Sequence, residues 1–173
     1  MSKVAIFFGP LKGAVNRVAD KIKADLGENA ELVPVKTASA ADFEKYDKII
    51  FGISTIGKET WDSDFSSNDW GDFLPEIGKA DFTGKTVAIY GLGDHITYSR
   101  NFVDFIGLLA GELTKQNATV VGQVPADEYE FEASEAVVDG LFMGLPLDED
   151  FEPELTDERL TEWLQKIKPH FGL

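Results

Sequence analysis

The glycine-rich segment Gly91-Leu92-Gly93 is one part of the sequence whose residue types and spacing could form a ligand site. Closely spaced glycines let a backbone approach a phosphate, as they do in the dinucleotide-binding fingerprint at the start of a helix. Here no third glycine follows and no helix is predicted to start there. The pattern therefore excludes a dinucleotide fingerprint and leaves residues 91–100 as an unusual loop.

Two more unusual loops follow predicted strands, at residues 9–15 and 54–68. Open parallel sheets bind their ligands beyond the carboxyl ends of the strands, where the strand order reverses. The three loops leave such ends, so we expect the chemistry of this protein to lie among them.

Several other kinds of site are excluded or disfavoured. The chain has no cysteine, which excludes disulfides, thiolate nucleophiles and iron–sulfur clusters. Its two histidines, His95 and His170, argue against a transition-metal site and support no nucleophile–histidine–acid triad. We interpret His95 as a solvated loop residue. Four loosely spaced acids lack the glycine and terminal glutamate of a calcium loop: Asp62, Asp64, Asp69 and Asp72.

The composition predicts one soluble domain over residues 1–173. Hydrophobic residues make up 43%, with 13 Phe and 3 Trp for a core. The 31 acidic and 16 basic residues give a net charge of −15, which argues against nucleic-acid and anionic membrane partners and favours basic proteins. We find no signal peptide and no long apolar run, so we expect a cytoplasmic protein. We also expect a monomer.

Hydrophobic patterning predicts the elements that position the loops. Continuous apolar runs predict strands at Lys3–Phe8, Lys48–Ile53, Thr86–Tyr90 and Thr119–Gly122, the first two of them buried. Leu32–Val35 is a weaker strand, which its proline puts at a sheet edge or makes irregular. Helical spacing predicts helices over 15–26, 70–77, 101–113 and 156–167 and a short one at 41–46, with Asn101 and Thr156 as caps. The alternation predicts a doubly wound, five-stranded parallel sheet with helices on both faces. Residues 125–151 look irregular and are expected to form an insertion in or after the last strand.

Longer motifs resemble the flavodoxin family. The loop from Gly91 to Tyr98 and the following Asn101–Gly107 are similar to the family's flavin-ring loop. Further matches resemble the tail of long-chain flavodoxins: Tyr129–Phe131, Ser134–Ala136, Phe142–Asp148, Thr156–Arg159 and Trp163. The resemblance implies noncovalent FMN binding. It also implies low-potential, one-electron transfer between a reductase and an acceptor protein, in a carrier rather than an enzyme.

The resemblance also implies which residues contact the flavin ring. Tyr98 stands at the stacking tyrosine of the family. On the other ring face, Ile56 occupies a place where many members have tryptophan, and an aliphatic residue there resembles the nitrogen-fixation subgroup. Trp61 is the alternative cover for that face, and the choice between the two stays open.

Other ring-side roles follow from the same resemblance. Gly57 lets a peptide turn when flavin N5 gains a proton. Asp94 and its neighbours offer hydrogen bonds to the pyrimidine edge, and the carboxylate keeps negative charge near N1, which lowers the potential. The remaining ring-side residues assigned to the site are Ser54, Thr55, Gly91, Leu92 and Gly93.

The first loop departs from the family pattern. Flavodoxins bind the FMN phosphate with a Thr-x-Thr-Gly-x-Thr run at a helix N-terminus. Here the run is Pro10-Leu11-Lys12-Gly13-Ala14-Val15 after Gly9, so all three hydroxyls are lost and only the glycine remains. One interpretation is a rebuilt phosphate site that uses Lys12, the remaining N–H groups and Asn16. The other is a loop without phosphate affinity, which would make the chain a flavodoxin-fold interaction module with lost or weakened FMN binding.

Overall fold

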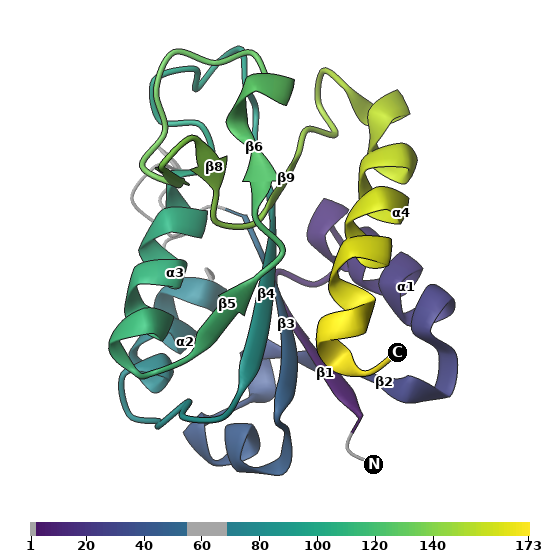
Figure 1. The fold of residues 1–173 in the computed structure, drawn as a ribbon, viewed down its shortest axis with the longest axis vertical. Helices are drawn as coiled ribbons and strands as arrows, with labels where there is room; N and C mark the ends of the chain where they lie inside the picture. Colours follow the sequence, from purple (N-terminus) through teal and green to yellow (C-terminus); the bar gives the residue numbers. More distant parts are fainter. Residues whose placement is uncertain (1–2, 55–68) are drawn as a thin grey trace.

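A parallel sheet forms the centre of the computed structural model, which describes residues 3–54 and 69–173 (Figure 1). The strand order is β2-β1-β3-β4-β5, with β9 also paired to β4. The strands are β1 (Val4–Phe8), β2 (Ala30–Pro34), β3 (Lys48–Ile53), β4 (Thr86–Leu92), β5 (Thr119–Val121) and β9 (Leu145–Leu147). Every pairing among them is parallel, so their carboxyl ends meet at one edge of the sheet.

The central strands are apolar on both faces because helices cover both. All five residues of β1 are buried, as are all but the first residue of β3 and of β4. β2, which ends in Pro34, is more exposed and lies at the sheet edge, where a proline costs no ladder hydrogen bond. The predicted doubly wound α/β sheet is confirmed.

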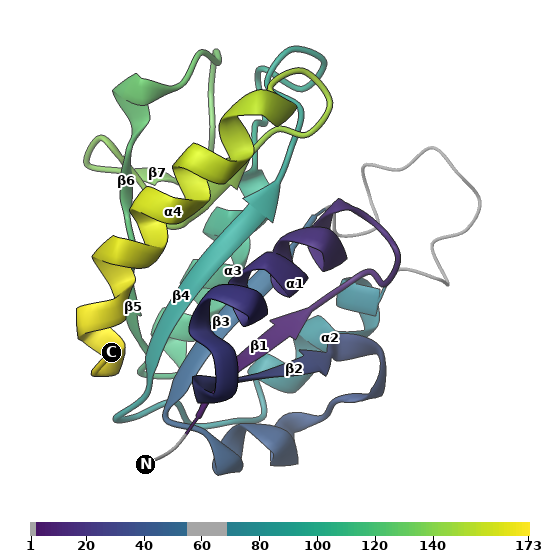
Figure 2. The ribbon, with the colours of Figure 1, turned by 90° about the vertical axis from the view of Figure 1, so that its right-hand side faces the viewer.

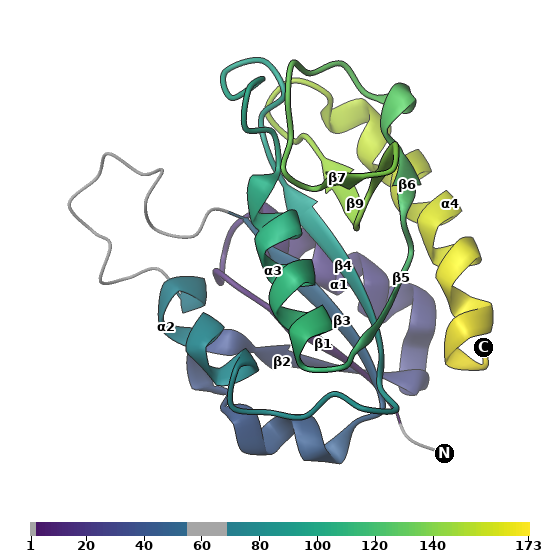
Figure 3. The same ribbon diagram turned by 60° about the vertical axis from the view of Figure 1, so that its left-hand side comes forward.

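In the described part of the chain, four α-helices form the outer layers. They are α1 (Ala14–Leu26), α2 (Asp69–Ile77), α3 (Asp104–Lys115) and α4 (Thr156–Ile167). α1 and α4 cover one face of the sheet (Figure 2), whereas α2 and α3 cover the other (Figure 3). Each helix buries an apolar stripe, such as Val15, Val18 and Ile22 in α1. Short 3₁₀ helices span Gly27–Asn29, Val35–Thr37, Ala40–Lys45, Ala126–Glu128, Pro153–Leu155 and Lys168–Phe171.

The insertion divides the last strand of the sheet in two. β5 pairs with the first half of β4, and β9 pairs with its second half, Tyr90–Leu92. Between them, β6 (Val124–Pro125), β7 (Val137–Val138) and β8 (Leu141–Phe142) form a small antiparallel sheet (Figure 3). The insertion is therefore where it was predicted. It contains regular strands that the sequence did not indicate, because strands of two residues are too short to show an alternation of apolar and polar residues.

Two predicted helix caps are wrong. α3 begins at Asp104 rather than after Asn101, because Phe102 is buried and its N–H donates to Ala133 O in the insertion, at 3.3 Å. Thr156 is the first residue of α4 and not its cap, since its hydroxyl donates to Glu149 Oε2 at 2.8 Å. Among the described residues, no helix has both the length and the apolar character needed to cross a bilayer.

Candidate functional site

A cavity of about 360 Å³ opens at the carboxyl ends of β3 and β4. This volume lies within the range of small-molecule sites. Its walls come from the start of α1, the loops after β3 and β4, the start of α3 and the turn after β9. The lining residues are Ala14, Arg17, Ser54, Leu92, Gly93, Asp94, Tyr98, Asn101, Val103, Asp104, Phe105, Glu149 and Asp150.

The cavity brings together six residues that the sequence assigned to the ligand site: Ala14, Ser54, Leu92, Gly93, Asp94 and Tyr98. Gly91 is the residue before the lining residue Leu92 and is paired with Ile53 in the sheet. Four other predicted ligand residues lie outside the described part of the chain: Thr55, Ile56, Gly57 and Trp61. The structure therefore joins the first and third predicted loops, with Ser54 marking the beginning of the second.

Asp94 organises the loop that carries Tyr98. Its Oδ1 accepts hydrogen bonds from the N–H groups of Ile96, at 3.0 Å, and Thr97, at 2.8 Å. Its carbonyl accepts one from the N–H of Tyr98, at 3.2 Å. This tight turn places Tyr98 at the cavity with 42% of its surface exposed. An exposed aromatic face at a cavity can stack on a flat ligand ring.

The loop after β1 begins at a crowded position. Gly9 is buried and its N–H donates to Gly52 O at 3.3 Å, while an added Cβ would lie 2.6 Å from Val35 Cγ2. The next residues, Pro10, Leu11 and Lys12, are exposed. Only glycine fits at this exit from the sheet, which sends the following residues out toward solvent.

The N-terminus of α1 can bind an anion through its backbone. Gly13 is its N-cap, with no side-chain cap, and the first turn contains no acid. The N–H groups of a first helical turn have no partner within the helix, and the helix dipole adds positive potential there. The Val15 side chain is buried in the core, so only the backbone of that residue can face a ligand. The N–H of Lys12 already donates to Asn16 Oδ1, at 3.0 Å.

Seven of the lining residues were not predicted from the sequence: Arg17, Asn101, Val103, Asp104, Phe105, Glu149 and Asp150. Arg17 resembles any charge on the polar face of a helix, yet it lines the cavity and pairs with Glu149 at 3.6 Å. Glu149 and Asp150 reach the site because β9 returns to the sheet after the insertion. No spacing in the sequence signals that return.

The cavity has an excess of negative charge. Among the described residues, its lining holds four carboxyl groups, those of Asp94, Asp104, Glu149 and Asp150, and one guanidinium, that of Arg17. Burial raises the pKa of Asp150, and the neighbouring Asp148, Asp94 and Glu149 raise it further. This arrangement opposes the gain of another negative charge by a bound molecule.

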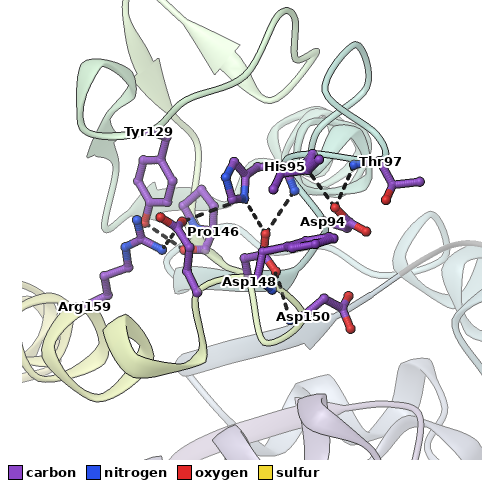
Figure 4. Close-up of polar contacts among 11 residues, drawn as sticks. Asp94, His95, Thr97, Tyr129, Pro146, Asp148, Asp150 and Arg159 are labelled. Atoms are coloured by element: carbon purple, nitrogen blue, oxygen red, sulfur yellow. Dashed lines mark hydrogen bonds and ion pairs between the residues drawn. The ribbon is translucent and has the colours of Figure 1, made fainter.

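A buried carboxylate lies behind the cavity wall (Figure 4). Asp148 is 1% exposed. Its Oδ2 accepts the N–H of His95, at 3.1 Å, and contacts His95 Nδ1, while its Oδ1 accepts the N–H groups of Asp150, at 2.9 Å, and Phe151, at 2.8 Å. Burial acts to raise the pKa of Asp148, but these hydrogen bonds outweigh it and hold the pKa below its ordinary value. The interpretation of His95 as a solvated residue is therefore wrong.

The same network reaches the insertion and α4. Glu152 Oε1 lies 3.8 Å from His95 Nδ1 and 3.1 Å from Arg159 Nη1. The Arg159 guanidinium is 4.3 Å from the centre of the Tyr129 ring, and the Tyr129 hydroxyl donates to a β9 carbonyl at 2.7 Å (Figure 4). Ligand atoms of His95, Asp148 and Glu152 lie within 4.8 Å of one another, as in a metal site. Arg159 and the backbone N–H groups already pair with the carboxylate oxygens of Glu152 and Asp148. We therefore interpret the three residues as part of a hydrogen-bond and ion-pair network rather than as a metal centre.

Comparison with known proteins assigns the family. The model of the flavodoxin family matches residues 6–163. The chain belongs to the flavodoxin family. It is 41% identical over 172 residues to a flavodoxin of Helicobacter pylori, covering 99% of this chain and 100% of that one. It is 38% identical over 176 residues to a flavodoxin of Trichodesmium erythraeum, covering 100% of both chains.

Solved structures give the same result. A Fusobacterium nucleatum flavodoxin bound to flavin mononucleotide superposes with a TM-score of 0.86 and 27% identity, over 98% of this chain and 99% of that one. A lysine-to-glycine mutant of that protein, also bound to flavin mononucleotide, has a TM-score of 0.86 and 28% identity, over 98% of this chain and 97% of that one. The likeness covers nearly the whole fold, including the insertion.

Proposed function

We propose that this chain is an electron carrier that binds FMN noncovalently in the cavity and moves one electron at a time from a reductase to an acceptor protein. The observation that carries the proposal is the cavity itself, which lies at the ligand-binding edge of a flavodoxin sheet with Tyr98 beside it. Bound FMN supplies the redox chemistry that the side chains of this cysteine-free protein lack.

The residues of the cavity fit such a cofactor. Tyr98 would stack on one face of the ring, and the backbone from Gly91 to Asp94 would hold its polar edge, with Ser54 at the start of the second loop. The other residues proposed for the ring, Thr55, Gly57 and either Ile56 or Trp61, lie outside the described part of the chain. The acidic groups of the lining make reduction of the flavin harder, which favours a low potential.

The phosphate is expected at the first turn of α1, where Gly13, Ala14 and Val15 offer N–H groups. Lys12 lies at this turn, and no carboxylate in the described part of the chain forms an ion pair with it. Arg17 faces the cavity one turn further on. We propose that these cations replace the missing hydroxyls, with Lys12 contributing more because Glu149 already holds Arg17.

Paired titrations test this assignment. The Lys12→Ala variant is expected to bind FMN about tenfold more weakly, as the loss of one charge-assisted hydrogen bond implies, with an unchanged affinity for riboflavin. Arg17→Ala is expected to show the same selectivity with a smaller loss. The matched control is Lys36→Ala, an exposed lysine that is not among the residues lining the cavity. An equal loss for FMN and riboflavin would remove Lys12 from the phosphate site.

The partners are proposed to be basic proteins, because the chain carries a net charge of −15. Redox complexes of this kind are small and short-lived. We propose that the chain acts as a cytoplasmic monomer, with its flavin edge free to contact the reductase and the acceptor in turn.

The second candidate, an interaction module without FMN, is not favoured, since it leaves the cavity and Tyr98 without a role. The visible spectrum of the purified protein and a titration with FMN separate the two. A yellow protein, or one that takes up one FMN per chain below about micromolar concentration, supports the carrier. A colourless protein that binds no FMN at micromolar concentration contradicts it.

A further inference from the structure

The backbone ladder between β4 and β9 ends beneath the cavity. Its last pair is Leu92 with Leu147, followed by one more hydrogen bond from the N–H of Gly93 to Leu147 O, at 2.9 Å. Beyond that point the two segments separate, and each contributes residues to the cavity wall. The loop after β4 carries Asp94 and Tyr98, and the turn after β9 carries Glu149 and Asp150.

The Asp148 side chain continues the connection where the backbone stops. One carboxylate oxygen accepts two hydrogen bonds from the turn that contains Asp150 and Phe151. The other accepts the N–H of His95 and contacts its Nδ1, in the loop between Asp94 and Tyr98. Figure 4 shows the carboxylate between these two segments. Neither Asp148 nor His95 is among the residues that line the cavity.

We propose that the Asp148–His95 pair positions the flavin-ring side of the site, by holding the 94–98 loop and the 149–151 turn at a fixed separation. The proposal rests on the proposed function. Asp148 and His95 act through Asp94, Tyr98 and Asp150, which are the groups placed to contact the ligand. Because the phosphate is expected at the first turn of α1, the pair acts chiefly on the affinity for the ring. The 149–151 turn also carries Glu149, which pairs with Arg17 at 3.6 Å, so a smaller effect on the phosphate is expected.

Asp148→Asn is the sharpest probe, because it keeps the size of the side chain. Its remaining oxygen can still accept from the 150–151 turn, but its amide then presents a donor to the backbone N–H of His95. We expect FMN, riboflavin and lumiflavin, which is the ring alone, all to bind about tenfold more weakly, with ratios that stay within about threefold of those of the unaltered protein. The visible circular dichroism of bound flavin is expected to change as well, since it reports the surroundings of the ring.

A pair of His95 variants separates the effect of the hydrogen bond between His95 Nδ1 and Asp148 from the effect of packing of the His95 ring. Asparagine places an amide N–H close to where Nδ1 lies, so His95→Asn is expected to bind riboflavin within about twofold of the unaltered protein. His95→Leu keeps apolar volume and removes the donor, so it is expected to bind several-fold more weakly. This comparison also tests the proposal if Asp148→Asn fails to fold.

Lys85→Met is the matched control for loss of stability. Lys85 directly precedes β4, so it lies at the opposite end of the sheet from the cavity. It is 9% exposed, and its Nζ donates a hydrogen bond to Tyr46 O at 2.7 Å. This variant is expected to lower the unfolding temperature without changing flavin affinity.

The outcomes separate the two proposals. If the unaltered protein binds no flavin, the proposed function fails. If it binds flavin and Asp148→Asn binds riboflavin equally well, only the positioning role is overturned. Equal losses in His95→Asn and His95→Leu would also overturn it, as would a loss in Asp148→Asn as selective for FMN over riboflavin as that expected for Lys12→Ala.

Discussion

Asp148 and Asp150 are two carboxyl groups, two residues apart, whose pKa values move in opposite directions. Asp148 is buried, but its hydrogen-bond donors hold its pKa below the ordinary value of an aspartate. Asp150 is exposed to solvent. The part of its side chain that is buried, together with three neighbouring carboxylates, raises its pKa. The same chemical group therefore has two roles, one structural and one electrostatic, and its surroundings decide which.

The lowered pKa of Asp148 makes it a source of pH-dependent stability. A carboxyl group with a depressed folded-state pKa stabilises the fold above its ordinary value, and this contribution is lost as the pH falls through the folded-state pKa. We expect Asp148→Asn to reduce the free energy of unfolding by about 2 kcal/mol at neutral pH. Urea unfolding should show this gap narrowing below about pH 4. A gap that is constant with pH would contradict the role of the charge.

Asp150 is expected to act on the potential of the bound flavin. Removing its negative charge in Asp150→Asn should raise the reduction potential by roughly tens of millivolts, since a nearby charge opposes electron gain even when screened by solvent. Glu158 is an exposed residue in the first turn of α4 and is not part of the cavity lining, so Glu158→Gln removes the same charge away from the cavity and serves as the control. Equal shifts in the two variants would show only an effect of net charge.

α3 contains two glycines with contrasting surroundings. A Cβ on Gly107 would collide with the backbone of Glu135 and Ala136, so this glycine lets the helix pack directly against the insertion. Gly111, one turn later, has nothing within 4 Å of such a Cβ. The contact at Gly107 joins the insertion to the helix whose first residues line the cavity.

Alanine substitutions at these glycines should have opposite effects. Gly111→Ala is expected to stabilise the protein by up to about 1 kcal/mol, because alanine favours a helix over glycine. Gly107→Ala gains the same preference but forces α3 and the insertion apart, so it should be destabilised by about 2 kcal/mol. Thermal unfolding of the two variants measures both effects. Stabilisation of Gly107→Ala would show that the insertion is not packed as described.

At the scale of the whole molecule, the net charge of −15 acts on association. Electron transfer from the reduced protein to a strongly basic c-type cytochrome is expected to slow about tenfold between about 10 mM and 300 mM ionic strength, because salt screens the attraction. Ferricyanide, a small anionic acceptor, is the control and should react faster as salt increases. A rate for the cytochrome that is independent of salt would contradict electrostatic guidance.

The sequence predicted the fold because its strands are continuous apolar runs separated by amphipathic helices, and each of these signals is local. Asp94 and Tyr98 were predicted for the same reason, since they lie within one recognisable loop. Asp148 and Asp150 were not assigned to the site because their place depends on β9 rejoining β4, and His95 lies 53 residues from Asp148. The caps at Asn101 and Thr156 failed because contacts with Ala133 and Glu149 override local preference.

The most direct test is a potentiometric titration of the protein mixed with one equivalent of FMN, followed by its visible spectrum. We expect two separate one-electron steps, the second at a potential below that of free FMN, because the acidic cavity resists the last electron. A single two-electron step at the potential of free FMN would contradict this expectation, because it would show that the cavity neither holds the flavin nor alters its chemistry.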